Sequence, residues 1–81
     1  MASQEHAELA FEARVAFTRL LLDKIRHDSH PSTAHMTLLE QTIPPELLRE
    51  YLNVLMEKVL TDSQPSIPML RRIQRIVSAL E

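Results

Sequence analysis

The sequence predicts an all-α protein, a small four-helix bundle with three long helices and one short helix. Two observations carry this prediction. The 81 residues include no glycine, which hairpin turns and phosphate-binding loops commonly require. They include five prolines, which separate stretches whose apolar residues recur at helical spacing. A chain of this length is expected to form a single helical domain, residues 1–81.

The first predicted helix covers residues 4–27, with Ser3 as its N-cap. Apolar residues recur three or four positions apart on two sides of this helix. One side carries Ala10, Ala13, Phe17, Leu20, Leu21 and Ile25, and the other carries Phe11, Val15 and Leu22. The helix is expected to end before Pro31, because the residue preceding a proline disfavours the helical conformation.

Three more helices are expected after this break. Residues 32–42 form the short one, and Pro44-Pro45 separates it from a helix over residues 45–60. A polar linker follows, and Ser66 is the expected N-cap of the last helix, residues 66–80, with Pro68 in its first turn. Each helix has an apolar stripe for a shared core.

The residue types give little support for catalysis or for a bound cofactor. The chain has no cysteine nucleophile and no serine in a glycine-containing elbow motif. His27, His30 and His35 lie close in sequence, but Pro31 separates them, and a metal site needs three or four converging ligands. We therefore predict no enzyme, no cofactor and no metal site. Histidines that titrate between about pH 5 and 7 and bias an interface remain an alternative.

The first helix carries more apolar surface than the rest of the chain is expected to cover. Exposed apolar patches commonly mark interfaces, and a two-fold homodimer is the commonest arrangement. We expect one of the two apolar sides to pack within the chain and the other to remain exposed, with Phe11, Val15 and Leu22 as the exposed set. The expected dimer interface comprises Phe11, Val15, Phe17, Leu21 and Leu22.

Charged side chains of the last two helices predict a second surface, for a protein partner. They are Glu50, Glu57, Arg71, Arg72 and Arg75. The formal net charge of −2 gives no overall attraction to nucleic acid or anionic lipid. The glutamates of residues 45–60 would repel DNA if that helix were a recognition helix, so we do not expect nucleic acid as the partner. No apolar run is longer than three residues, the length of Leu20–Leu22, and we expect no secretory leader. We therefore expect no membrane segment and a cytoplasmic location.

The stretch from Leu20 to Leu60 resembles the small enterobacterial biofilm-development and acid-resistance regulators, which connect two-component systems. The similarity rests on the Leu20–Leu22 run with Ile25, on Leu38-Leu39-Glu40-Gln41, and on Pro45-Glu46, Tyr51, Leu55 and Leu60. This resemblance implies a helical homodimer that binds a response regulator or a similar signalling protein. The chain departs from the family pattern because it has no glycine in the first break and has a fourth helix.

The expected function is therefore that of a non-enzymatic regulatory adaptor, which forms a homodimer and binds a signalling or regulatory protein through helix surfaces. Two alternatives stay open. The chain has the length and composition of a docking or assembly module, or a chaperone, of a larger complex. The three arginines of residues 66–80 leave a nucleic-acid-binding transcriptional regulator as a further alternative.

Overall fold

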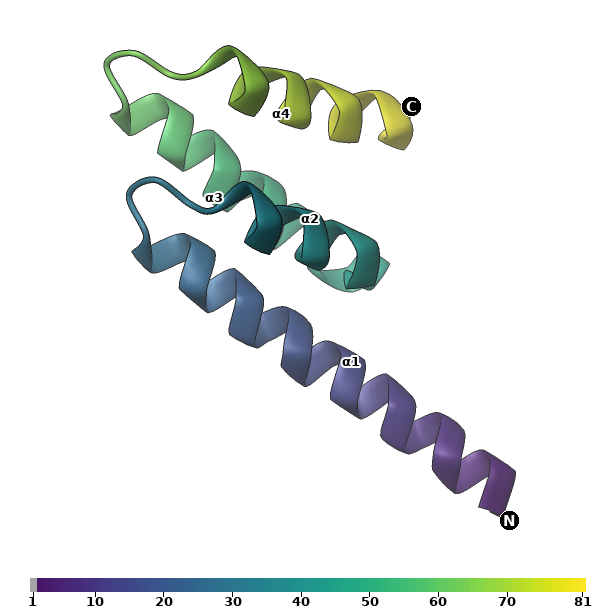
Figure 1. Cartoon of the computed structure of the whole chain (residues 1–81). Coiled ribbons are helices and arrows are strands. Elements are labelled where there is room, and N and C mark those ends of the chain that lie inside the picture. The colour runs from purple at the N-terminus through teal and green to yellow at the C-terminus, as the bar shows by residue number, and fades with distance from the viewer. Residues whose placement is uncertain (1) are drawn as a thin grey trace. The chain divides into compact units, whose positions relative to one another are not determined.

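The computed structural model describes the backbone of residues 2–81 and the side chains of residues 4–81 (Figure 1). The all-α prediction is confirmed, since these residues contain four α-helices and no strand. The helices are α1 (Ala2–His27), α2 (Thr33–Thr42), α3 (Leu48–Thr61) and α4 (Ile67–Leu80), with a 3-10 turn, η1 (Pro45–Leu47), before α3. The chain forms two compact units, of which the first ends at Leu48 and the second begins at Arg49.

Serine caps begin two of the four helices. The Ser66 Oγ accepts a hydrogen bond from the amide of Met69 at 3.2 Å, which confirms the predicted cap of α4. The Ser32 Oγ accepts from the amide of His35 at 3.4 Å and caps α2 in the same way. The prediction that Ser3 caps the first helix is wrong, because α1 begins at Ala2 and Ser3 lies inside the helix.

The segment predicted as one helix over residues 45–60 has two parts. Pro44 is extended, at φ −74° and ψ 152°, and its carbonyl accepts the amide of Leu47 at 3.0 Å. This bond belongs to the tighter 3-10 turn η1, and the α-helical pattern begins only at Leu48. Pro45 has no amide hydrogen to donate, and it fits the first turn of this segment, where amides have no partner within the helix.

In the first unit, α1 and α2 form a helical hairpin in which α2 lies beside the C-terminal half of α1 (Figure 1). Between them, the Asp28 carboxylate accepts a hydrogen bond from the His30 amide at 3.0 Å, and the helix has ended before Pro31 as predicted. Ile25 and Leu39 are fully buried, and Thr18 is buried with its hydroxyl bonded to the Arg14 carbonyl at 2.8 Å.

In the second unit, α3 and α4 are joined by a five-residue connection that reverses the chain (Figure 1). The Asp62 carboxylate accepts the amide of Gln64 at 2.9 Å and fixes the start of this turn. One broad side of α3 is buried, and it comprises Tyr51, Leu52, Val54 and Leu55. On α4 the apolar side is only partly covered, since Leu70 and Val77 remain exposed.

Candidate helix interface

One apolar stripe of α1 is covered along part of its length. We call it the inner stripe, and its members follow a strict spacing of four and three positions: Phe11, Val15, Thr18, Leu22 and Ile25. The exposed fraction of the side chain is 55% at Phe11, whereas Val15 is half-buried, Leu22 is 2% exposed and Ile25 is fully buried. The inner stripe therefore enters the core only in the C-terminal half of α1.

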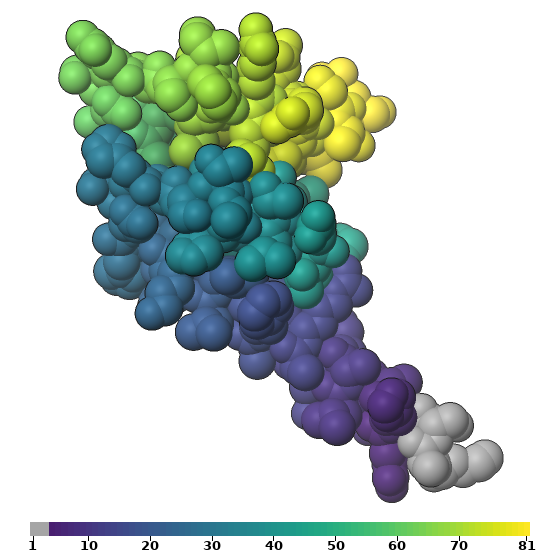
Figure 2. Space-filling view, in the orientation of Figure 1, coloured from purple at the N-terminus to yellow at the C-terminus, as the bar shows by residue number. Residues whose placement is uncertain are grey.

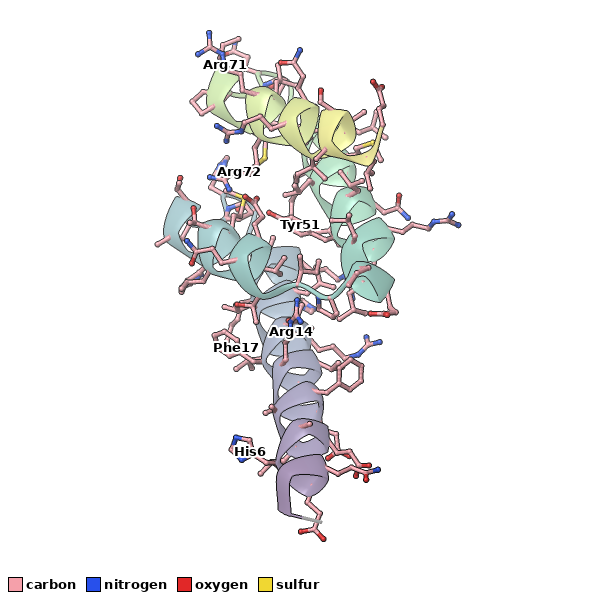
Figure 3. The ribbon with its side chains drawn as sticks, turned by 90° about the vertical axis from the view of Figure 1, so that its right-hand side faces the viewer. His6, Arg14, Phe17, Tyr51, Arg71 and Arg72 are labelled. Atoms are coloured by element: carbon pink, nitrogen blue, oxygen red, sulfur yellow. The ribbon has the colours of Figure 1, made fainter. Side chains whose placement is uncertain are left out.

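Arg14 marks the point where α2 stops covering α1. Its Nη2 donates a hydrogen bond to the carbonyl of Ile43 at 3.2 Å, and its Nε donates to the carbonyl of Thr42 (Figure 3). These carbonyls lie at the C-terminal end of α2, where the helix has no amide donors of its own to offer. The guanidinium thus acts as a C-terminal cap supplied by another helix, and its charge suits the negative end of the helix dipole.

Beyond Arg14 the N-terminal part of α1 has no other helix of its unit beside it. Every side chain from Gln4 to Arg14 is exposed. The space-filling view shows this segment, in purple, extending past the side chains of α2 (Figure 2). Half of a long amphipathic helix is therefore left without an apolar neighbour in its own unit.

A second apolar stripe follows the opposite side of the helix, at about 100° of rotation per residue. We call it the outer stripe, and it comprises Leu9, Ala13, Ala16, Phe17 and Leu20. All five side chains are exposed, Leu9 at 64% and Leu20 at 55%. Phe17 projects from the same side of α1 as His6 (Figure 3). The outer stripe is thus an apolar surface on the side of α1 that faces away from the inner stripe.

The five residues predicted as a dimer interface differ in their exposure. Phe11 and Phe17 are exposed, Val15 is half-buried, and Leu21 and Leu22 are buried. The prediction that Leu22 lies exposed is wrong. Both leucines lie in the half of α1 that carries α2, so neither is accessible to a second molecule in this structure.

Three residues that matter for this surface were not among the predicted site residues. Leu9 extends the outer stripe by one turn, and its spacing from Ala13 and Phe17 would have revealed it. Thr18 lies at the expected position of the inner stripe between Val15 and Leu22, but its polarity hid it. Nothing in the sequence signals the capping role of Arg14, because that role depends on where α2 ends.

The charged residues predicted to bind a protein partner also differ in their exposure. Arg71 and Arg75 lie on one side of α4 and are exposed, whereas Arg72 is buried, and Arg71 and Arg72 leave the helix in different directions (Figure 3). The prediction of a shared three-arginine surface is therefore wrong for Arg72, because consecutive helical residues differ by about 100°. On α3, Glu57 is exposed and Glu50 is half-buried, and their spacing places them on one side of the helix.

The side chain of His27 makes a local polar contact on α1. The His27 Nδ1 lies 2.9 Å from the Asp23 carbonyl oxygen and 3.3 Å from an oxygen of its carboxylate. Over residues 4–81, whose side chains are described, no three histidine or acidic residues are grouped so that they could hold a metal ion. In the described part of the chain, none of the helices combines the length and the apolar character needed to cross a membrane.

Comparisons of the chain with protein-family models, with curated proteins and with solved structures give no match.

Proposed function

We propose that the protein is a non-enzymatic regulatory adaptor, which associates with itself through α1 and binds a second protein through charged and apolar surfaces of α3 and α4. The single observation that carries the proposal is the exposure of α1. This amphipathic helix has one apolar stripe that is wholly exposed and another that is exposed at its start. Contact with another molecule would remove this apolar surface from water.

Self-association uses one of two surfaces of α1, the exposed start of the inner stripe or the outer stripe. Phe11 represents the first surface and Phe17 the second, and both are exposed aromatic side chains. Aromatic residues contribute strongly to interface energies, because each removes a large apolar area from water. Replacing the interface residue with aspartate would place a charge in that contact, at a large cost in free energy.

Light scattering of Phe11→Asp and Phe17→Asp, beside the wild type, tests the self-association. The variant that alters the interface is expected to scatter as a single chain, while the other scatters like the wild type. Circular dichroism of both variants controls for folding. A wild type that scatters as one chain at high micromolar concentration would remove this part of the proposal.

The second surface is proposed for a signalling or regulatory protein. Arg71 and Arg75 are exposed on one side of α4, and the apolar residues Leu70 and Val77 are exposed on another. Apolar area stabilises a protein interface, and charged groups orient it. The resemblance of Leu20–Leu60 to connectors of two-component systems makes a response regulator the first partner to examine.

Capture experiments with the wild type and the double variant Arg71→Glu/Arg75→Glu test this surface. A response regulator or other signalling protein is expected to be held by the wild type and lost with the variant. The control is Arg49→Glu, which makes this kind of substitution once, at an exposed position of α3. A partner held equally by all three proteins would exclude Arg71 and Arg75 from its binding site.

A further inference from the structure

We infer that the outer stripe of α1 binds the outer stripe of a second copy in antiparallel orientation. The inference rests on the self-association proposed above, and it specifies which surface is used and how the two helices run. Leu9, Ala13, Ala16 and Leu20 are spaced by four, three and four positions, the repeat that places residues along one seam between two long helices. All four are exposed in the described structure.

The ends of this seam are polar. Continuing the same spacing outward gives His6 before Leu9 and Asp23 after Leu20. In an antiparallel pair that is centred between Ala13 and Ala16, Leu9 lies opposite Leu20 of the second copy and His6 lies opposite its Asp23. A histidine and an aspartate can share a hydrogen bond or an ion pair there. A parallel pair would instead place Asp23 beside Asp23 of the second copy, and two negative charges repel one another there.

The charges beside the seam favour the same orientation. Four residues recur at intervals of seven along one edge of the outer stripe: Glu5, Glu12, Arg19 and Arg26. The first two are acidic and the last two are basic. When two such helices run antiparallel, residues of this edge meet residues of the same edge, so Glu5 approaches Arg26 of the second copy and Glu12 approaches its Arg19. Charges at such flanking positions determine orientation in helix pairs.

A parallel pair gains nothing from these charges. In that orientation this edge meets the opposite edge of the second copy, which carries Ala10, Phe17 and Lys24. Glu12 would then lie beside an aromatic ring, and Arg19 would approach Lys24. Arg19 and Arg26 each interact with a group of their own chain as well, and the antiparallel pair adds an acidic neighbour to each.

Binding of a second copy to the outer stripe is compatible with the fold of the first unit. The seam lies opposite the inner stripe, which carries the buried residues Leu22 and Ile25. A second copy therefore binds α1 without displacing α2. Because the pair has two-fold symmetry, every contact occurs twice, and the contact closes after two copies.

Disulfide trapping tests the orientation, since the natural chain has no cysteine. In the antiparallel pair, position 9 lies beside position 20 of the second copy, while the two positions 9 are eleven residues apart, about 16 Å along the helix axis. A disulfide requires Cα atoms within about 7 Å. Leu9→Cys and Leu20→Cys are therefore expected to cross-link when mixed and not when either is oxidised alone. Leu60→Cys, at a highly exposed position of α3, controls for random collision.

Charge exchange provides a second test that keeps the apolar seam intact. Glu12→Arg and Arg19→Glu each place like charges opposite one another in their own dimers, and each is expected to weaken self-association about tenfold, as estimated from exposed ion pairs made twice. A mixture of the two variants pairs opposite charges again and is expected to associate at least as tightly as the wild type. The control is Glu8→Arg, which makes the same change away from the seam.

The outcomes separate this inference from the proposed function. A wild type that stays monomeric contradicts both. A dimer in which Leu9→Cys cross-links alone contradicts the antiparallel seam and leaves self-association in place. A dimer that is insensitive to Glu12→Arg and to Phe17→Asp contradicts the outer stripe, and binding of a different protein at this stripe would do the same.

Discussion

Arg14 of α1 donates a hydrogen bond from its Nη2 to the carbonyl oxygen of Ile43, at the end of α2, over 3.2 Å. A second bond joins its Nε to the carbonyl of Thr42. This one side chain links the middle of α1 to the end of α2, and it marks how far back along α1 the second helix reaches. The exposed segment before Arg14 follows directly from that limit.

Replacing Arg14 with methionine is expected to lower the free energy of unfolding by about 1 kcal/mol, because the α2 carbonyls lose a charged donor while the aliphatic stem is kept. Urea denaturation followed by circular dichroism measures this loss. Lys24→Met also removes a positive charge from an exposed position of the same helix, and it should alter stability much less. Equal losses in both variants would show that the cap contributes nothing.

The core of the first unit includes Ile25 of α1 and Leu39 of α2, both of which are fully buried. Ile25→Ala or Leu39→Ala is expected to cost about 3 kcal/mol, since each leaves a cavity in the core. Leu60→Ala is the matched control, because that leucine is 84% exposed and its loss should be almost neutral. Denaturation midpoints of the three variants give the comparison.

The start of α4 depends on the hydroxyl of Ser66, which accepts the amide of Met69. Ser66→Ala is expected to lower stability by about 1 kcal/mol, and Ser66→Asp should preserve the cap through its carboxylate. Ser78→Ala, an identical change inside the same helix, should be neutral or slightly stabilising. Thermal unfolding of all three variants separates the cap from the general effect of losing a hydroxyl.

Salt dependence provides a further prediction for the proposed dimer. The flanking pairs between acidic and basic residues are solvent-exposed, so their attraction is screened as ionic strength rises. The dimer dissociation constant of the wild type is expected to rise a few-fold between low and high salt. Glu12→Arg replaces two attractive pairs with repulsive ones and keeps the two Glu5–Arg26 pairs, so its dissociation constant should respond to salt much less. An equal response in both proteins would contradict the flanking pairs.

Local features of this fold could be predicted from the sequence, and features that depend on where a neighbouring helix ends could not. Ser66 and Pro68 predicted the start of α4 because a cap requires only a few consecutive residues. Leu22 was predicted to be exposed because the sequence did not show which side of α1 receives α2. Arg72 was grouped with Arg71 and Arg75, although only the structure shows that it is buried.

The sequence predicted an apolar surface on α1, and the structure corrected which residues belong to it. Two apolar stripes on one helix were evident from spacing, and Phe11 and Phe17 are exposed as an interface requires. The extent of the exposed segment before Arg14 was not predictable, because the sequence does not show which turn of α1 lies beside the end of α2, where Arg14 forms its bonds. The accessible apolar residues of α1 include Leu9 and Leu20, whereas Leu21 and Leu22 are buried.

Sedimentation equilibrium of the wild-type chain, run from low to high micromolar concentration, tests the central claim most directly. The exposed stripes of α1 predict that the mass rises with concentration from one chain to two and stops there, because a two-fold contact closes on itself. The mass of a single chain at every concentration would contradict the account, and so would growth beyond two chains.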